Sequence, residues 1–286
     1  MDIAGGDIVV GYDDTTASIA AVRWAAELAR CTGSELHLVH AWSWPLLGQG
    51  VSGIPVIDPA GPRNQASRLL DDAAEEVGRR FPDVAVTTEL RPGLPRDVLE
   101  EISERTALLV VGTRGLGAVL GTLLGSVSRG ILHDAGCPVA VIRSAEHRAG
   151  PVLAGFDGSP SAREAIDVAA DLAAAWDVPL RVVHVRSDAH APYGTGAEAW
   201  SAGSRSREVL DEGVARALAR HEGLAVQSRM LEARSAVEGL LAAAVGARML
   251  VIGHRGLSRG RFGSTAHATV LHATGNVTVV RRASPE

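Results

Sequence analysis

The sequence predicts an α/β protein of two tandem domains, each a parallel sheet with helices on both faces. Its 286 residues are enough for about two domains, because one domain averages roughly 150 residues. The chain also repeats itself once, with matching segments in the same order in each half. Within each half, short β-branched runs alternate with longer helical patterns, which is typical of βαβ units around a parallel sheet.

The internal repeat is visible when the chain is compared with itself. Five segments of the first half have a counterpart in the second: IVVGYDD (8–14) with VLAGFDG (152–158), AVRWAAELAR (21–30) with AIDVAADLAA (165–174), ELHLVHA (35–41) with PLRVVHV (179–185), LLVVGTRGL (108–116) with MLVIGHRGL (249–257), and CPVAVIR (137–143) with NVTVVRR (276–282). The junction is predicted near EHRAG (146–150), which gives one domain at 1–147 and a second at 148–286.

The order of elements follows from the first copy. Five strands are predicted there, near residues 7–12, 35–41, 84–90, 107–112 and 138–142. Runs such as LLVVG are apolar at every position, as expected of a strand covered by helices on both faces. The first helix is predicted to begin after Thr15 or Thr16, either of which can cap it. Ser159 followed by Pro160 marks the same start in the second copy.

Two segments differ between the copies. Residues 41–62 and 185–200 each follow the second strand of their copy and are rich in glycine, proline and aromatic residues. We therefore expect both to be long loops over one edge of the sheet. Trp42 and Trp44 are expected to pack the first loop down rather than to stack on a ligand.

Composition and charge exclude several classes of function. The formal net charge is −5 and all 28 basic residues are arginine, so the chain has no Walker lysine and no Schiff-base lysine. MDIAGGDIVV has an acidic residue where a signal peptide carries basic ones, and no apolar run approaches membrane-spanning length. We therefore expect a cytoplasmic protein without a membrane partner. Cys31 and Cys137 stand in no ligand spacing and are expected to be buried free thiols.

A glycine-rich turn follows the fourth predicted strand. Gly112 closes the strand, Gly115 follows after two residues, and nine more residues lead to Gly125-Ser126, directly before the helical stretch 126–135. Ligands of open parallel sheets bind beyond the carboxyl ends of the strands, and the unpaired N–H groups of a helix N-terminus suit phosphate. The predicted phosphate contacts are the N–H groups of Gly125, Ser126 and Val127, the Ser126 hydroxyl and the Arg114 guanidinium.

Asp13 lies at the end of the first predicted strand, across the switch point from this turn. Its carboxylate is placed to accept hydrogen bonds from a base amino group or a ribose hydroxyl, which indicates a nucleotide. The alternative is that the glycines only permit tight strand-to-helix turns and that Asp13 caps the first helix. Composition alone does not separate the two interpretations.

The spacing of these glycines resembles the ATP-binding motif of the universal stress protein family. The flanking segments agree: VVGYDD resembles that family's first strand and aspartate, LHLVHA its second strand, and ILHDAGCPVAVIR its closing helix and strand. The resemblance covers nearly the whole chain in two copies. It implies a Rossmann-like, adenine nucleotide alpha hydrolase-like fold, with a five-stranded parallel sheet and helices on both faces in each copy.

The resemblance also implies a ligand and its contacts. The ligand is ATP or ADP, which Mg²⁺ can accompany. In the first copy, adenine would lie near Asp13 and Ala41, ribose near Gly11 and Gly112, and the phosphates on Gly115, Gly125, Ser126, Val127 and Ser128. The matching positions of the second copy are Gly155, Asp157, Val185, Gly253, Arg255, Gly256, Gly263, Ser264 and Thr265.

The two copies depart from the motif in different ways. In the second copy only six residues separate Gly256 from Gly263, so the phosphate loop is three residues shorter. His254, Arg255, Arg259 and Arg261 raise the positive charge there. In the first copy Asp14 replaces the glycine usual after the aspartate and is expected to face solvent. We expect the first site to be the better formed.

Three classes of function remain open at this stage. The first is a nucleotide-dependent regulatory protein of the stress response, the second a slow ATPase or another nucleotide-dependent enzyme, and the third a partner-binding module with a vestigial loop. The chain has no GxxxxGK[ST], no GxSxG and no HExxH motif. No catalytic residue is assigned, so hydrolysis, if present, should be slow. This favours the regulatory, nucleotide-binding role.

The remaining expectations concern other partners. His37, His40 and His184 lie in strand patterns and are expected to be core or strand-end histidines, so no metal site is predicted. The negative net charge disfavours nucleic acid. The closing strands of the two copies are expected to pair with each other as an internal pseudo-dimer, since edge strands are usually covered or paired. A further homodimer is left open.

Overall fold

A computed structural model describes residues 3, 5–42, 60–113, 124–146, 149–187, 196–256 and 263–281, with the backbone alone for 60, 62 and 196–203. The elements of the first half are β1 (Ile8–Gly11), α1 (Thr16–Thr32), β2 (Leu36–Trp42), α2 (Ala60–Arg80), β3 (Val86–Pro92), α3 (Pro95–Ser103), β4 (Leu108–Gly112), α4 (Ser126–Asp134) and β5 (Val139–Ile142).

The second half repeats this order after one short connection. Its elements are β6 (Val152–Gly155), α5 (Pro160–Ala175), β7 (Leu180–Ser187), α6 (Gly196–Arg220), β8 (Val226–Ala233), α7 (Ala236–Ala243), β9 (Met249–Gly253), α8 (Ser264–His272) and β10 (Val277–Val280). The chain is therefore two tandem α/β domains, as the repeat predicts.

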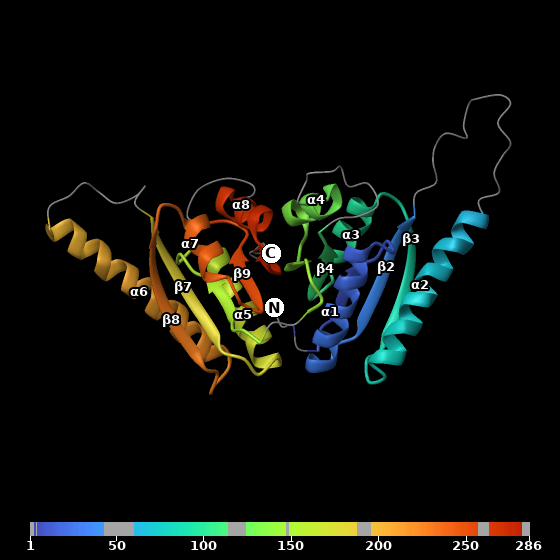
Figure 1. Cartoon of the computed structure of the whole chain (residues 1–286), viewed down its shortest axis with the longest axis horizontal. Helices are drawn as coiled ribbons and strands as arrows, with labels where there is room; N and C mark the ends of the chain where they lie inside the picture. The colour runs from blue at the N-terminus through green and yellow to red at the C-terminus, as the bar shows by residue number, and fades with distance from the viewer. Residues whose placement is uncertain are drawn as a thin grey trace, which may run out of the picture.

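All ten strands form one continuous sheet, in the order β3-β2-β1-β4-β5-β10-β9-β6-β7-β8. Pairing is parallel within each half, and only β5 and β10 run antiparallel among the described strands. Ala140 pairs with Thr278 in the middle of that junction. The predicted pairing of the two closing strands is confirmed, and Figure 1 shows the halves side by side across it.

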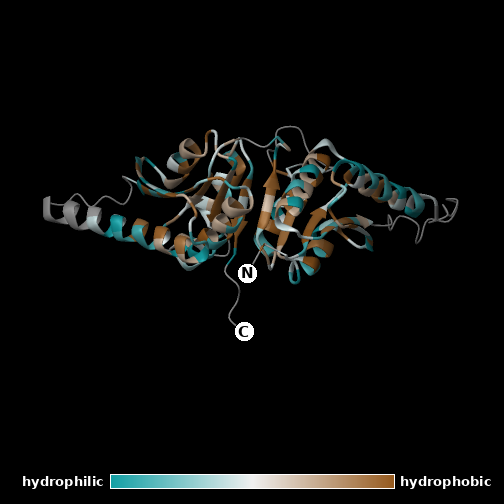
Figure 2. Ribbon diagram, turned by 90° about the horizontal axis from the view of Figure 1, so that it is seen from below, coloured by the Kyte–Doolittle hydropathy of each residue, from teal (hydrophilic) through white to brown (hydrophobic). Residues whose placement is uncertain are grey.

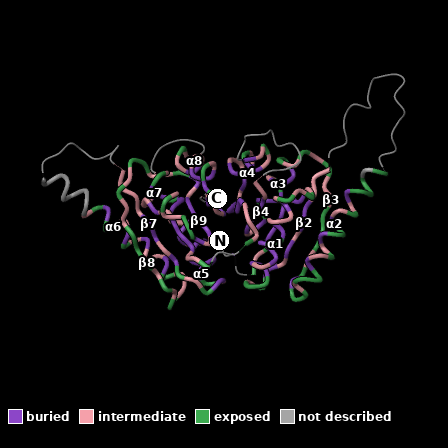
Figure 3. Tube along the Cα trace, in the orientation of Figure 1, coloured by how far each residue is buried: buried purple, intermediate pink, exposed green. Residues whose placement is uncertain are grey.

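Helices cover both faces of the sheet. Side chains of α1, α2, α5 and α6 share one apolar core with one face of the strands. Side chains of α3, α4, α7 and α8 pack into a second core on the other face. Figures 2 and 3 show the result, with hydrophobic, buried strands inside and polar, exposed residues along the outer sides of α2 and α6. Since both faces are covered, strands such as β4 are apolar throughout.

The predicted helix starts are confirmed. The Thr15 hydroxyl accepts a hydrogen bond from the Ser18 N–H and caps α1. Ser159 caps α5 through the Ala162 N–H, with Pro160 at the first helical position. These residues satisfy N–H groups that the first turn of a helix leaves unpaired.

The two predicted loops are shorter than expected where the structure describes them. Strand β2 includes Trp42, and α2 already begins at Ala60. Strand β7 runs to Ser187 and α6 begins at Gly196, so the loop prediction was wrong at 185–187 and 196–200. Strand β7 pairs with β8 as far as Ser187. The local content of glycine and proline, on which the loop was predicted, does not reveal this pairing. Trp44 lies outside the described residues.

The expectation for the two cysteines has a mixed outcome. Cys31 and Cys137 are both free thiols, but only Cys137 is buried, because Cys31 lies on the outward side of α1. Among the described helices, none is both long enough and apolar enough to cross a membrane.

The seam between the halves is closed on both faces of the sheet. On the α1 and α5 face, Trp24 and Trp176 meet edge to face with ring centroids 5.7 Å apart. The Arg248 guanidinium stacks 4.5 Å from the Trp176 ring centroid and lies 3.1 Å from the Glu27 carboxylate. On the other face, Arg143 of the first half donates to the backbone oxygens of Val270 and Gly275. The halves therefore behave as one packed unit.

Candidate functional site

The strand ends predicted to hold a ligand meet at one edge of the sheet. β1 pairs with β2 on one side and with β4 on the other, so the winding direction switches at β1. Gly11, Ala41 and Gly112 therefore lie at the carboxyl edge of three neighbouring strands. In Figure 1 this is the upper edge, beside α4 in the first half and α8 in the second. A switch point of this kind is where open α/β sheets bind ligands.

Asp13 forms the turn between β1 and α1. Its Oδ1 atom accepts hydrogen bonds from the Thr15 hydroxyl at 2.6 Å and from the Thr15 N–H at 3.3 Å. Its own N–H donates to the Ser18 hydroxyl. The carboxylate thus has a structural role at the helix start, in addition to its position at the switch point.

Asp14 occupies a backbone conformation that favours glycine. Its φ is +60°, and Gly158 at the matching position of the second half has φ +77°. A non-glycine residue tolerates this region poorly, although aspartate does so better than most. The Asp14 side chain is exposed, as predicted, and its Oδ1 accepts a hydrogen bond from the Tyr12 hydroxyl at 3.0 Å.

Replacing Asp14 with glycine is expected to lower the pKa of the Tyr12 phenol. Burial, followed by the hydrogen bond and charge of Asp14, raises that pKa well above its ordinary value. Burial remains in the Asp14→Gly variant, so we expect the Tyr12 pKa to fall only part of the way to its ordinary value. Ultraviolet titration of tyrosinate checks this in a Tyr193→Phe background, because the chain has only 2 tyrosines. An unchanged titration curve would show that the Asp14 contact is not formed.

The raised pKa of Tyr12 also determines how the stability of the protein depends on pH. A phenol with a raised folded-state pKa binds its proton more tightly in the folded protein than in the unfolded chain. The stability that it contributes is therefore fully present below about pH 10, the ordinary tyrosine pKa, and is lost as the pH rises further. Thermal unfolding across the alkaline range should show this loss, and Asp14→Gly should reduce it.

The start of α4 carries the predicted phosphate contacts of the first half. Gly125 is the N-cap residue of the helix, and its N–H donates to the Thr113 oxygen at 2.7 Å. Ser126 is exposed at the first turn and Val127 is partly buried. The Ser128 hydroxyl donates to the Gly112 oxygen at 2.7 Å, which ties the helix to the strand end. Arg114 and Gly115 lie outside the described residues.

The second half has an open cleft at the matching edge. Its volume is about 580 Å³, including the part that is open to solvent. The following predicted residues line it: Gly155, Asp157, Val185, Gly253, Arg255, Gly256 and Thr265. Gly263 and Ser264 lie at the adjoining start of α8, where the Gly263 N–H donates to the His254 oxygen at 3.0 Å. The structure thus brings the nine predicted residues of this half to one place.

The cleft has an apolar side and a polar side. Val185 at the end of β7 lies with Ala236 and Leu240 of α7 on one side of β6. Arg255, Gly256 and Thr265 lie beyond β9 on the other side. Asp157 follows β6 between the two groups. Such a division suits a ligand with an apolar ring at one end and negative charge at the other.

The loop after β9 is held close to the start of α5. The Ser159 and Ser161 hydroxyls both donate to the Arg255 oxygen. A side chain on Gly256 would place its Cβ atom 2.7 Å from the Asp157 Oδ2 atom. Gly256 therefore allows the loop to approach the carboxylate, which a larger residue would displace.

His254 contributes less charge to this loop than the sequence analysis assumed. Its side chain is buried, and burial together with the nearby Arg281 and Arg255 lowers its pKa to about 4. The imidazole is therefore neutral at pH 7. The positive charge of the described part of the loop comes from Arg255, while Arg259 and Arg261 lie outside the described residues.

All three strand histidines lie within or near the end of a strand, as predicted, and two of them bond a backbone oxygen at the carboxyl edge. The His40 Nδ1 atom lies 2.7 Å from the Tyr12 oxygen, and the His184 Nδ1 atom lies 2.8 Å from the Phe156 oxygen. Both rings therefore brace the turn that follows β1 or β6. His37 lies at the opposite edge of the sheet and makes different contacts.

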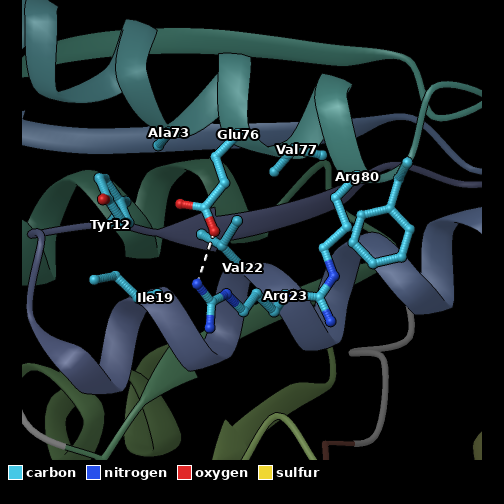
Figure 4. A pocket seen from close by; sticks show the side chains of 9 residues that line it. Tyr12, Ile19, Val22, Arg23, Ala73, Glu76, Val77 and Arg80 are labelled. Atoms are coloured by element: carbon cyan, nitrogen blue, oxygen red, sulfur yellow. Dashed lines mark hydrogen bonds and ion pairs between the residues drawn. The ribbon is translucent and has the colours of Figure 1, made fainter.

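A second cleft, which sequence reasoning missed, lies between α1 and α2 (Figure 4). It holds about 310 Å³ of empty space, and the Arg23 to Glu76 ion pair of 2.7 Å crosses it. Its other lining residues are Tyr12, Ile19, Val22, Ala73, Val77, Arg80 and Phe81. None of the predicted ligand contacts lines this cleft, so it is separate from the candidate site.

The matching helix seam of the second half carries three ion pairs. Arg163 contacts Glu212, Arg216 contacts Asp167, and Arg220 contacts Asp171. The repeat therefore preserves the strands and helix starts while the outer helices are joined differently in the two halves.

Comparison with known proteins finds relatives of both halves. The model of the universal stress protein family matches residues 6–143 and again 149–281. Universal stress protein Rv2623 of Mycobacterium tuberculosis is 32% identical over 261 residues, which cover 87% of this chain and 86% of that protein. A universal stress protein of Mycolicibacterium smegmatis is 32% identical over 288 residues, which cover 96% of each chain.

A solved structure shares the fold. The crystal structure of a universal stress protein from Archaeoglobus fulgidus matches with a TM-score of 0.72 at 19% identity. The match covers 96% of this chain and 98% of that chain, so both halves and the junction between them are included.

Proposed function

The chain belongs to the universal stress protein family as a tandem member, and on this premise we propose that it is a nucleotide-dependent regulatory protein of the stress response. ATP or ADP would bind at the carboxyl edge of the sheet, with Mg²⁺ able to accompany it. The observation that carries the proposal is the cleft of the second half, which is lined by residues selected from the sequence alone.

The chemistry of the cleft supports a nucleotide. The apolar side formed by Val185, Ala236 and Leu240 suits a purine ring, and the Asp157 carboxylate accepts hydrogen bonds from ribose hydroxyls or a base amino group. Arg255 and the N–H groups at the start of α8 suit phosphate oxygens, since a helix N-terminus favours negative charge.

The first half supports the same function with a longer loop. Gly125 and Ser126 begin α4 at the edge where Gly11 ends β1 and Ala41 lies one residue before the end of β2. The nine residues between Gly115 and Gly125 give this half more chain to enclose phosphates. We therefore propose that the first site binds more tightly than the second.

Binding rather than hydrolysis is the proposed role. The ionisable side chains that line the described cleft are Asp157, His184 and Arg255. Asp157 accepts from the Ser159 N–H at 3.0 Å, and His184 bonds the Phe156 oxygen. These contacts hold both side chains in the turn after β6. Asp157 and His184 are therefore suited to orienting a ligand rather than to transferring a proton.

The test is to count the nucleotide bound in each half. Protein purified without added nucleotide is denatured, the released nucleotide is identified by mass spectrometry, and ATP affinity is measured by titration calorimetry. Asp13→Ala or Gly115→Ala should remove binding from the first half. Gly256→Ala should weaken binding in the second half at least about 10-fold, equivalent to about 1.4 kcal/mol, because the new methyl group displaces Asp157.

Gly275→Ala is the matched control. A Cβ atom at Gly275 meets nothing within 4 Å, so nucleotide binding should not change. Unchanged affinity and stoichiometry in Asp13→Ala, Gly115→Ala and Gly256→Ala would contradict the proposed sites. Protein that carries no nucleotide and binds none on titration would favour the partner-binding alternative.

A further inference from the structure

A second group of chemically active side chains lies at the opposite edge of the sheet. Asp7 directly precedes β1, Glu35 directly precedes β2, and His37 is the second residue of β2. Val9 pairs with His37 in the parallel register, so Asp7 and Glu35 stand side by side at the amino ends of their strands. Because alternate residues of a strand share a face, Glu35 and His37 point to the same side of the sheet.

The three side chains converge. One ligand atom from each lies within 4.8 Å of the others, and the His37 Nε2 atom is 3.6 Å from the Asp7 Oδ1 atom. Zinc binds imidazole nitrogen and carboxylate oxygen at about 2.0–2.2 Å, which puts neighbouring ligands of a tetrahedron about 3.3 Å apart. Small side-chain rotations would therefore bring these atoms to binding distance.

The imidazole is already oriented toward the carboxylates. The Thr87 hydroxyl on the neighbouring strand β3 hydrogen-bonds the His37 Nδ1 atom, and the two residues pair in register. The Nε2 atom is shielded from solvent and makes no hydrogen bond to any described residue. At 3.6 Å, the Asp7 oxygen is too far away for a hydrogen bond. A metal-bound histidine has this arrangement, with one nitrogen held by an oxygen and the other directed at the ion.

We infer that Asp7, Glu35 and His37 form a site for one divalent transition-metal ion, for which Zn²⁺ is the best match. Two carboxylates and one imidazole supply two negative charges and a nitrogen ligand, whereas Mg²⁺ and Ca²⁺ prefer oxygen alone. The Asp7 side chain is 56% exposed, so water can complete the coordination from the solvent side. The inference does not depend on the proposed nucleotide function.

The second half provides an internal comparison. The residues that match Asp7, Glu35 and His37 are Pro151, Pro179 and Arg181. Arg181 donates to the Gln227 side chain at 3.2 Å, in the place of the His37 contact with Thr87. None of these three residues offers a metal ligand, so we expect one ion per chain. The sequence does not single out His37 among the strand histidines, because only the strand register brings Asp7 to it.

The test uses the full chain without an affinity tag, freed of metal by dialysis against a chelator. Titration calorimetry with ZnCl₂ should give one site per chain, and Co²⁺ should develop the visible absorption bands of a tetrahedral site. His37→Gln and Glu35→Gln should each weaken Zn²⁺ binding at least about 10-fold, and Thr87→Val by about 10-fold through loss of the orienting hydrogen bond. His272→Gln, at an exposed histidine of α8, is the control and should not change binding.

Asp7→Asn provides a variant at an exposed side chain, should the strand variants fail to fold by circular dichroism. Absence of Zn²⁺ binding by the parent chain would overturn the inference. So would one-to-one binding that persists unchanged in His37→Gln, Glu35→Gln and Asp7→Asn. The nucleotide count of the same preparations is read separately, so failure of one proposal leaves the other intact.

Discussion

Replacing Gly112 or Gly253 with alanine is expected to destabilise the protein by about 1–3 kcal/mol, the usual cost of adding a methyl group where there is no space. A Cβ atom at Gly112 would lie 2.7 Å from the backbone carbon and oxygen of Ala17. At Gly253 it would lie 2.8 Å from the backbone nitrogen of Ala162. These obstacles are backbone atoms in the first turn of α1 and α5, so no side-chain rotation relieves them.

Urea unfolding followed by circular dichroism measures this effect as a shift of the midpoint to lower urea. Gly275→Ala is again the control, since the added methyl group meets nothing there. A midpoint equal to that of the parent chain in both Gly112→Ala and Gly253→Ala would show that the strand and helix are not in close contact.

This prediction separates two kinds of glycine within one motif. Gly112 and Gly253 are required because a helix start lies against the strand end. Gly256 instead lets the loop approach the Asp157 carboxylate in the cleft. The close-packing interpretation therefore holds for Gly112 and Gly253, while ligand binding at Gly256 stays a prediction. Spacing alone does not distinguish them, because both kinds of glycine follow the same strand.

The strands and helix starts were predictable for a physical reason. A strand covered on both faces, such as LLVVG, must be apolar at every position, and Thr15 and Ser159 carry the hydroxyls that cap a helix. These signals are local. The end of β7 at Ser187 depends on pairing with β8, which is a contact between distant segments, and it was predicted wrongly.

The candidate site was predictable as a set of residues but not as a geometry. The resemblance to the family motif, carried over to the repeat, selected seven of the residues that line the second cleft. The contact between Gly256 and Asp157 and the neutral, buried His254 depend on how residues 253–256 pack against the start of α5. The group of Asp7, Glu35 and His37 has no motif spacing, because the register of β1 and β2 creates it.

The largest expected effect at the junction of the halves comes from Asn276→Ala, which should cost about 2–4 kcal/mol of stability. The Asn276 Oδ1 atom accepts hydrogen bonds from the N–H groups of Arg143 at 2.8 Å and Ser144 at 3.2 Å. Its Nδ2 group donates to the Ser144 oxygen at 3.0 Å. The side chain is 7% exposed, so water cannot readily replace these bonds when alanine removes them.

The effect should appear in unfolding as a loss shared by both halves, since the residue belongs to the second half and its three partners to the first. Asn64→Ala, at an exposed position of α2, is the matched control and should change stability by less than about 0.5 kcal/mol. The strand register places Pro138 at the equivalent position of the first half, since its oxygen accepts from the Leu109 N–H as the Asn276 oxygen does from the Leu250 N–H. Proline has no amide side chain and cannot make the counterpart bonds. An Asn276→Ala variant as stable as the control would mean that this residue adds nothing to the junction beyond the β5–β10 pairing, the tryptophan contact and the Arg143 and Arg248 contacts.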